Sequence, residues 1–203
     1  GQEATAAGMC EVLSDSDQVF SSHRGHGHYI AKGGSLRSFM AELLGKETGC
    51  CKGIGGSMHL IDLDVGFVAA TPIVGGIVPV AVGAAMANKL KNNGLVSTLF
   101  LGDGTTEEGV FHESISFASL HGLPVIFFCE NNFFSVYTHL SERQPASRTI
   151  ADLARVHEVS RLRVGRGGLP PIPFCLMEAS RDLRGFFFFA RPPLAVRRFF
   201  QFS

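Results

Sequence analysis

Two polar motifs follow two apolar segments of strand length, and their residue types suit them to bind a ligand. Gly102-Asp103-Gly104 follows residues 96–101, and Asn131-Asn132 follows residues 124–129. Asn132 stands 29 residues after Asp103, which is about what one strand, one helix and two turns consume. Because both strands of a right-handed crossover end at the same edge of a parallel sheet, we expect the two side chains to converge there.

A carboxylate and an amide oxygen at one sheet edge suit a hard cation such as Mg²⁺, which is often bound together with phosphates. Gly104 permits close approach of the backbone, and the free N–H groups of a helix beginning at Thr105 favour an anion. Taken singly, Asp103 reads as a turn residue and Asn132 as part of a loop. Their matched positions at two strand ends favour a cradle for a metal ion and a diphosphate.

The elements that must position this cradle predict an α/β fold. Residues 105–120 have helical spacing, with Thr105 and Glu108 at the spacing of a capping box. The flanking apolar runs are typical of parallel strands buried on both faces. We therefore predict a doubly wound, mostly parallel sheet with helices on both faces. The other expected elements are helices over residues 2–13, 35–45 (capped by Ser35) and 77–91, and glycine-rich loops over residues 21–34 and 45–57.

Composition narrows the class of protein. Of the 203 residues, 45% are hydrophobic and 18% charged, with a formal net charge of zero, which argues against nucleic acid or an anionic membrane as partner. The longest apolar run, residues 73–87, is interrupted by glycine and proline, so no membrane span is expected. Five cysteines in no metal or disulfide spacing indicate a reducing compartment. The adjacent Cys50 and Cys51 are either a redox pair or ordinary half-buried thiols.

The character of the chain changes after about residue 160. Every lysine lies at or before Lys91, whereas nine of the thirteen arginines lie from Arg155 onward, and residues 186–189 are four phenylalanines. We therefore divide the chain into a ligand-binding domain over residues 1–157, expected to lack its N-terminal beginning, and an atypical tail over residues 158–203. A shifted reading frame, disorder and a genuine but poorly patterned tail are the alternatives for that tail.

Several motifs in combination resemble the α subunit of the thiamin diphosphate-dependent dehydrogenase component of 2-oxo acid dehydrogenase complexes, of the pyruvate or acetoin type. Gly-Asp-Gly followed by Asn-Asn is the metal signature of thiamin diphosphate enzymes. The likeness spans residues 1–157, which the resemblance identifies as a thiamin diphosphate-binding domain. The matching segments are His-Arg-Gly-His-Gly-His at 23–28, Lys-Gly-Ile-Gly-Gly-Ser-Met-His at 52–59, Ile-Val-Gly at 73–75, Glu-Gly-Val-Phe-His-Glu-Ser at 108–114 and Cys-Glu-Asn-Asn at 129–132.

The resemblance implies a role for each matching residue. Mg²⁺ would be bound by Asp103, the side chain of Asn132 and the backbone carbonyl of Phe134. His26 would form a wall of the active site, with its catalytic role open. The remaining implied contacts are Gly102, Gly104, Thr105, His23 and Arg24 with the diphosphate, and Pro72, Ile73 and Val74 with the aminopyrimidine ring.

The resemblance also implies a reaction and partners. The expected reaction is oxidative decarboxylation of a pyruvate-like 2-oxo acid, or cleavage of acetoin, with acyl transfer to a lipoyl-bearing acyltransferase. The chain would act as α subunit of a heterotetramer whose β subunit supplies a glutamate to the aminopyrimidine. The expected location is the cytoplasm, or the mitochondrial matrix if a targeting segment is missing.

Other readings stay open. The family's late His-Gly-His-Ser type loop has no counterpart after Asn132, so a non-catalytic or truncated relative acting as a binding or dimerisation module is the alternative. A transketolase or decarboxylase would share the metal motif. His23, His26 and His28 could form a solvated loop, or a zinc site, although their spacing matches no standard ligand pattern. No glycine motif has the context of a dinucleotide or P-loop site.

Overall fold

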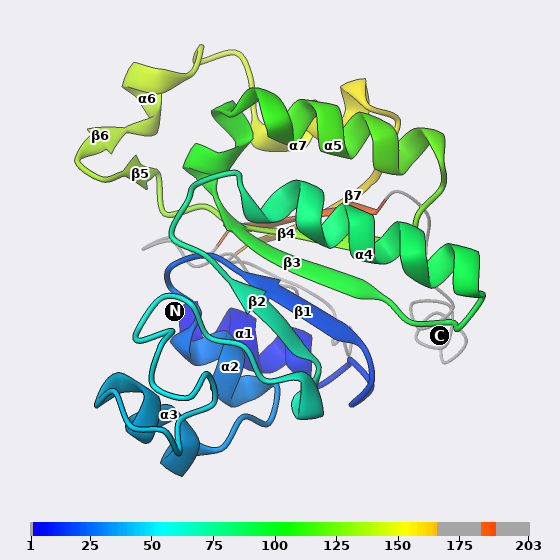
Figure 1. The fold of residues 1–203 in the computed structure, drawn as a ribbon. Helices are drawn as coiled ribbons and strands as arrows, with labels where there is room; N and C mark the ends of the chain where they lie inside the picture. Colours follow the sequence, from blue (N-terminus) through cyan, green and yellow to red (C-terminus); the bar gives the residue numbers. More distant parts are fainter. Residues whose placement is uncertain (1, 166–183, 190–203) are drawn as a thin grey trace.

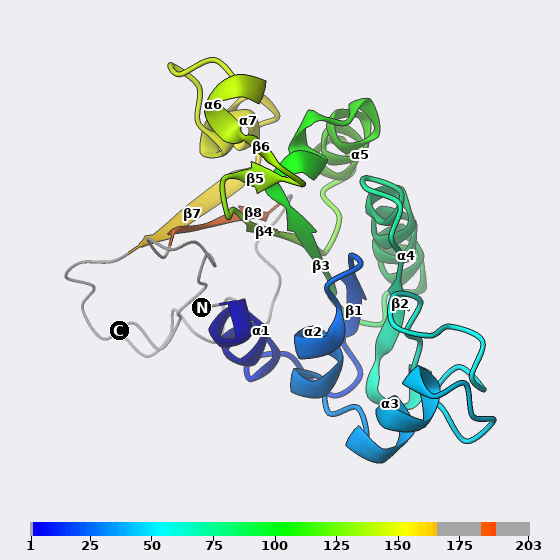
Figure 2. The same ribbon diagram turned by 90° about the vertical axis from the view of Figure 1, so that its left-hand side faces the viewer.

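The computed structural model describes residues 2–165 and 184–189, which form a six-stranded sheet between two groups of helices (Figures 1 and 2). The strands of this sheet are β1 (Gln18–Ser21), β2 (Phe67–Ala70), β3 (Ser97–Gly102), β4 (Val125–Glu130), β7 (Ser160–Gly165) and β8 (Arg184–Phe189). They lie in the order β2-β1-β3-β4-β8-β7. The first four in this order are mutually parallel, whereas β8 and β7 join as antiparallel strands. The predicted α/β fold with a mostly parallel sheet is confirmed.

Helices cover both faces of the sheet (Figure 2). Each face has its own cluster of buried apolar side chains, so the sheet separates two cores. One face is covered by α1 (Gln2–Cys10), α2 (His26–Ala31) and α3 (Leu36–Leu43), and the other by α4 (Ile77–Lys91), α5 (Gly109–Leu120) and α7 (Ile150–Val156). None of the helices in the described part of the chain is long and apolar enough to cross a membrane.

The β3–α5–β4 unit follows directly from the sequence pattern. All six residues of β4 and the first five of β3 are buried, as expected for parallel strands covered on both faces. Small residues let α4 pack closely against the sheet, and both Ala81 and Ala85 are fully buried. The left-handed conformation of Asn92 ends α4 at its predicted boundary.

Two local predictions were wrong. Residues 105–120 are not one helix: a short 3₁₀ helix, η2 (Asp103–Glu107), precedes α5. Glu108 has extended backbone angles and makes no side-chain cap bond, while the Thr106 hydroxyl donates to the Asp103 carbonyl at 2.7 Å. The predicted capping box of Thr105 and Glu108 is therefore absent. The turn after β3 forms the separate helix η2, with its own internal hydrogen bond, before α5 begins.

Part of the stretch predicted as a loop over residues 21–34 is helix α2. Its residues His28 and Tyr29 are almost fully buried, and the His28 ring stacks on Phe100 of β3 with centroids 3.9 Å apart. Tertiary packing of these rings outweighs the low helix propensity of the surrounding glycines. By contrast, the glycine-rich loop over residues 45–57 contains no regular helix or strand, as predicted.

A single buried carboxylate organises that second loop. Glu42, at the end of α3, is fully buried, and its Oε2 accepts the backbone N–H groups of Cys51 and Gly53, each at 2.8 Å. Its Oε1 accepts those of Gly55 at 2.7 Å and Gly56 at 3.0 Å. Although burial raises the pKa of Glu42, the four N–H donors outweigh it and hold that pKa below its ordinary value.

Strands β7 and β8 fall within the segment predicted as an atypical tail. The antiparallel pairing of β8 with β4 and of β7 with β8 extends the sheet at its β4 edge. The rest of that segment, residues 166–183 and 190–203, lies outside the described residues. The proposed division at residue 157 and the reading-frame hypothesis stay predictions.

Candidate functional site

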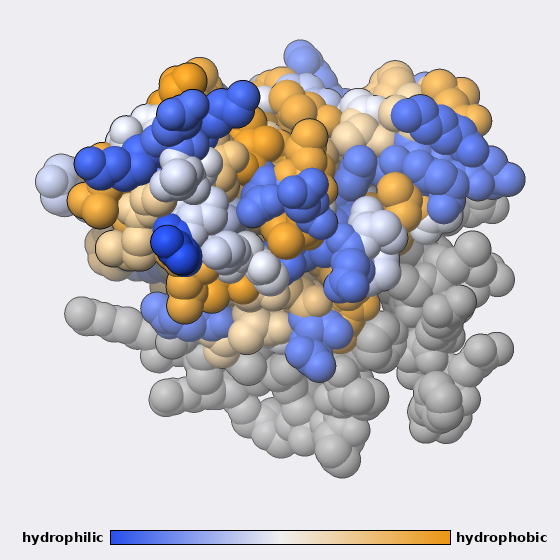
Figure 3. Space-filling view, turned by 60° about the horizontal axis from the view of Figure 1, so that its bottom comes forward, coloured by the Kyte–Doolittle hydropathy of each residue, from blue (hydrophilic) through white to orange (hydrophobic). Residues whose placement is uncertain are grey.

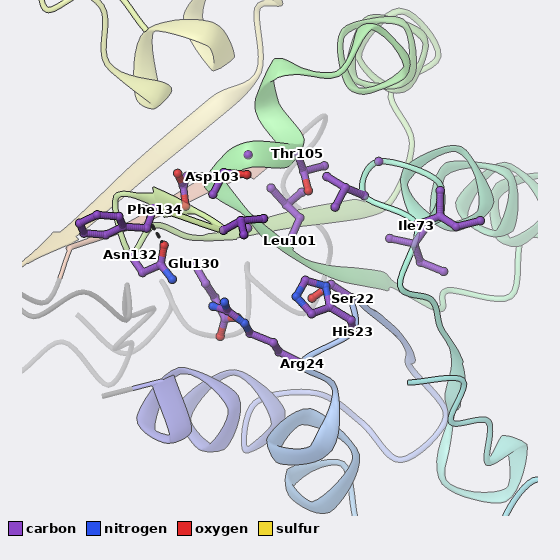
Figure 4. Close-up of a pocket in the computed structure, with 17 residues that line it drawn as sticks. Ser22, His23, Arg24, Ile73, Leu101, Asp103, Thr105, Glu130, Asn132 and Phe134 are labelled. Carbon is purple, nitrogen blue, oxygen red and sulfur yellow. Dashed lines mark hydrogen bonds between the residues drawn. The ribbon is translucent and has the colours of Figure 1, made fainter. Parts of the chain in front are cut away.

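A pocket of about 290 Å³ lies at the carboxyl ends of β1, β3 and β4 (Figure 4). Clefts that hold small molecules in proteins typically start at about 300 Å³. Gly102 and Glu130 are paired in register at the ends of β3 and β4, so the residues that follow them enter the pocket side by side. The predicted residues that line it are His23, Arg24, Ile73, Val74, Gly102, Asp103, Gly104, Thr105, Asn132 and Phe134.

Asp103 supplies the buried charge of this pocket. Its side chain is only 2% exposed, and burial raises the pKa of its carboxyl although Arg143 beside it acts in the opposite direction. A carboxylate whose desolvation is incompletely offset gains from a further cation. This observation fits a site for Mg²⁺, which prefers oxygen ligands.

The backbone after β4 turns so that Asn132 and Phe134 both face the pocket (Figure 4). The Phe134 N–H donates to Asn132 Oδ1 at 2.9 Å, and the Phe133 N–H donates to Asn131 Oδ1 at the same distance. Phe133 takes a left-handed conformation with φ of 66°. Phe134 then begins the two-stranded hairpin of β5 (Phe134–Ser135) and β6 (Thr138–His139). The hydrogen bonds to the two asparagine side chains fix the turn that places the Asn132 side chain and Phe134 at the pocket.

Gly104 brings two segments of the pocket into close contact. A Cβ atom at this position would lie 2.8 Å from Ser135 Oγ and 3.2 Å from Ser135 Cβ. A side chain would fit there only if the Ser135 side chain moved aside, so the glycine leaves backbone next to the cavity. Thr105 follows in the first turn of η2, where unpaired N–H groups suit an anion.

Two basic residues face this edge from the opposite side. His23 and Arg24 follow β1, and both line the pocket. No carboxylate of the described residues pairs with the Arg24 guanidinium, whose fork of donors matches a phosphate. Partial burial, and secondarily the charge of Arg24, lowers the pKa of His23. A lowered pKa favours the uncharged form of the His23 imidazole.

The apolar wall of the pocket comes from the segment before α4. Ile73 and Val74 line the cavity, with 70% and 47% of their surface exposed. Pro72 immediately precedes them and is half-buried, outside the lining. Exposed aliphatic side chains beside a charged cradle can cover the apolar part of a ligand.

His26 lies apart from the other predicted residues. It lines a neighbouring cavity together with His23 and Arg24, and its Nε2 lies 2.9 Å from both the carbonyl and the hydroxyl of Ser57. His28 contacts Ser21 and Glu130 instead. Among the described residues, no cluster of metal-ligating atoms includes the three histidines, so the zinc alternative has no geometric support. The catalytic role of His26 stays a prediction.

No role was assigned from the sequence to two charged residues of the site. Glu130 lines the pocket, accepts the Thr5 hydroxyl at 2.6 Å and lies 3.1 Å from His28 Nε2. Its place directly before the two asparagines was a usable signal. Arg143, which bonds to Asp103, had none, because forty residues and several elements separate the two in sequence.

The adjacent thiols show no sign of redox pairing. Cys50 Sγ and Cys51 Sγ lie 4.0 Å apart, and both cysteines are free. Burial raises the pKa of Cys51 to about 11, which disfavours the reactive thiolate. These observations favour ordinary half-buried thiols.

Comparisons with known proteins give one family match and several curated relatives. Residues 1–180 match the family model described as "Dehydrogenase E1 component". The chain is 46% identical over 164 residues to the α subunit of acetoin:2,6-dichlorophenolindophenol oxidoreductase from Bacillus subtilis (strain 168), covering 81% of this chain and 49% of that protein. It is 43% identical over 141 residues to the pyruvate dehydrogenase E1 component subunit alpha from Rhizobium meliloti (strain 1021), covering 70% and 40%. The chain spans about half the length of the curated relatives it matches.

Proposed function

Because the chain belongs to the dehydrogenase E1 component family, we propose that it forms the thiamin diphosphate- and Mg²⁺-binding part of an α subunit. The activity proposed for the whole enzyme is oxidative decarboxylation of a small 2-oxo acid, or cleavage of acetoin, with acyl transfer to a lipoyl carrier. The observation that carries the proposal is the convergence of Asp103, Asn132 and Phe134 on one pocket opposite Arg24 (Figure 4).

Each residue has a definite task in this proposal. When bound, thiamin diphosphate supplies the electron sink that lets a 2-oxo acid lose CO₂. Asp103, the Asn132 side chain and the Phe134 carbonyl hold Mg²⁺. The backbone at Gly104 and Thr105, together with Arg24 and His23, holds the diphosphate. The apolar wall of residues 72–74 keeps water from the aminopyrimidine ring.

A β subunit is proposed as the partner that completes the site. Apolar side chains are exposed around the pocket and on the side that carries α3, and Figure 3 shows them among polar residues on that side. Large exposed apolar surfaces commonly mark protein interfaces. Examples are Ile54 at 87%, Val136 at 81%, Ile73 at 70%, Leu63 at 69% and Leu44 at 68%.

The first test is calorimetric titration of the purified chain with thiamin diphosphate, with Mg²⁺ and with a chelator in its place. We expect saturable binding that requires Mg²⁺. The chain has no tryptophan, so calorimetry is preferable to fluorescence quenching. Binding that is equal with and without Mg²⁺ would contradict the proposed cradle. A folded chain that does not bind, even with a β subunit present, would favour the non-catalytic binding or dimerisation module.

A second test concerns the reaction and the tail. The coding DNA beyond codon 157 should contain, in another frame, a His-Gly-His motif and ordinary composition. The restored α chain, mixed with a β subunit, should then reduce 2,6-dichlorophenolindophenol when pyruvate or acetoin is added. Comparing the two substrates identifies the reaction, and no reduction with either would contradict the proposed activity.

A further inference from the structure

Arg143 bonds to three different residues at the end of the pocket where Asp103 lies. No sequence motif indicated these contacts. Arg143 is the last residue of α6 (Leu140–Arg143), and only 10% of its side chain is exposed. Its Nη2 donates to Asp103 Oδ2 at 2.5 Å, and its Nη1 donates to Glu107 Oε1. Its Nε donates to the Thr138 carbonyl at 3.1 Å. One guanidinium therefore binds two carboxylates and the backbone of a third segment.

These partners belong to the two halves of the proposed metal site. Asp103 and Glu107 lie at the two ends of η2, directly after β3. Thr138 pairs with Ser135 in the β5–β6 hairpin, whose first residue is Phe134. Arg143 thus connects the segment with the ligating carboxylate to the segment with the ligating carbonyl.

The neighbouring residue reinforces the same connection. Gln144 is buried, and its Nε2 donates to Glu107 Oε1 at 2.9 Å and to Thr106 Oγ1 at 3.3 Å. The Thr106 hydroxyl in turn donates to the Asp103 carbonyl at 2.7 Å. The η2 turn is therefore held along its length by the residues at the end of α6.

The geometry favours support of a metal ligand over competition with the metal. An ionised carboxylate has about four acceptor positions on its two oxygens, and the Arg143 bond is made to Oδ2. A guanidinium fork fixes the rotation of the carboxylate, which a lysine ammonium does not. Its positive charge also offsets one of two neighbouring negative charges, which reduces the repulsion that would otherwise separate Asp103 from Glu107.

We propose that Arg143 is a positioning residue of the metal site, which orients the Asp103 carboxylate and locks the β5–β6 hairpin against η2 so that Mg²⁺ finds its ligands already assembled. The proposal rests on the proposed function, because it needs a metal at Asp103. Partners of this kind typically account for 10- to 100-fold in metal affinity.

The test is a calorimetric titration of Mg²⁺ into the 203-residue chain at a fixed, saturating concentration of thiamin diphosphate. The variants are Arg143→Met, which removes the guanidinium, and Arg143→Lys, which keeps only the charge. Arg155→Ala is the matched control, because Arg155 pairs with Asp152 at 3.4 Å on the surface, with 68% of its own side chain exposed. Thermal unfolding of each metal-free variant is measured in parallel.

For Arg143→Met we expect the Mg²⁺ midpoint to rise about 10- to 100-fold, with an unchanged number of sites at saturation. The Mg²⁺ midpoint of Arg143→Lys should lie between those of Arg143→Met and the unmodified chain. The midpoint of Arg155→Ala should equal that of the unmodified chain. An unchanged midpoint would overturn the proposal. A lower midpoint would overturn it too, because Arg143 would then compete with the ion. Fewer sites with an unchanged midpoint would show a purely structural role. If the unmodified chain binds no cofactor even with a β subunit present, the proposed function fails and this inference fails with it.

Discussion

Asp103 and Glu42 are both buried carboxylates, yet their surroundings shift their pKa values in opposite directions. Glu42 accepts four backbone N–H groups of one glycine-rich loop, and its pKa is lowered. Asp103 faces a cavity, and its pKa is raised by burial despite the Arg143 guanidinium. The exposed fractions, 0% and 2%, are almost the same. Burial alone therefore does not distinguish a structural carboxylate from one available to a ligand.

The distinction lies in whether the protein itself satisfies the charge. Around Glu42 the chain supplies donors to both oxygens, so the ionised form stabilises the loop and nothing further is needed. Around Asp103 the chain leaves part of the desolvation cost uncompensated, and a cation would offset it. We infer that the first region is a completed structural unit and that the second is prepared for a metal ion.

The largest expected effect comes from removing the Asp103 carboxylate. Asp103→Ala should weaken Mg²⁺-dependent binding of thiamin diphosphate by about 100-fold or more, equivalent to ~3 kcal/mol. The metal-free chain should unfold at nearly the same temperature, because Arg143 keeps its ion pair with Glu107 and its bond to the Thr138 carbonyl, so no buried charge is left unpaired. Calorimetry and thermal unfolding measure the two quantities. Cofactor affinity equal to that of the unmodified chain would remove Asp103 from the site.

Glu42 should show the reverse behaviour. Glu42→Gln places an amide NH₂ group against backbone N–H donors, which leaves buried donors unsatisfied and should lower the free energy of unfolding by about 3 kcal/mol. Chemical denaturation measures this, with the exposed Glu47→Gln on the same loop as control. A change as small as that of the control would mean that the loop does not depend on the Glu42 carboxylate.

Acid should reduce the difference in stability between the unmodified chain and Glu42→Gln. Because the pKa of Glu42 is lowered on folding, its stabilisation is fully present above the ordinary value of 4.5 and is lost as the pH falls through the folded-state value. The difference in free energy of unfolding between the unmodified chain and Glu42→Gln should therefore be constant above pH 4.5 and shrink below it. A series of denaturation curves between neutral pH and pH 3 gives the profile, and a difference that grows on acidification would reverse the assigned sign.

The sequence predicted the sheet edge well because its signals are local and strong. Residues 96–101 and 124–129 are continuous apolar runs, and the small residues of 77–91 have helical spacing, so β3, β4 and α4 were expected close to their observed bounds. β1 and β2 have only four residues each, too few for a periodic signal. α2 lies among glycines and owes its helix to burial of His28 and Tyr29.

Polar contacts between residues far apart in the sequence could not be predicted from local sequence patterns. The asparagine turn was predictable, because Asn131 and Asn132 directly follow a buried strand. The donors to Glu42 come from residues 51–56, and Arg143 reaches Asp103 from another element. No periodicity or spacing rule relates such pairs, since each contact exists only after the backbone has folded. The sequence therefore predicted the proposed ligands of the metal site. It did not predict Arg143, the side chain proposed to fix their arrangement.

The smallest predicted effect tests how tightly the Asp103 region is assembled. In Gly104→Ala the new methyl would lie 2.8 Å from Ser135 Oγ and 3.2 Å from Ser135 Cβ, so Ser135 must move aside, and we expect the adjacent Phe134 carbonyl to move with it. The Mg²⁺ midpoint for cofactor binding should rise by less than about tenfold, or under ~1.4 kcal/mol. Ser135→Gly removes both close atoms and should restore the midpoint in the double variant. If the double variant binds as weakly as Gly104→Ala, the glycine serves the approach of the diphosphate to the backbone, and contact with the hairpin is not its reason.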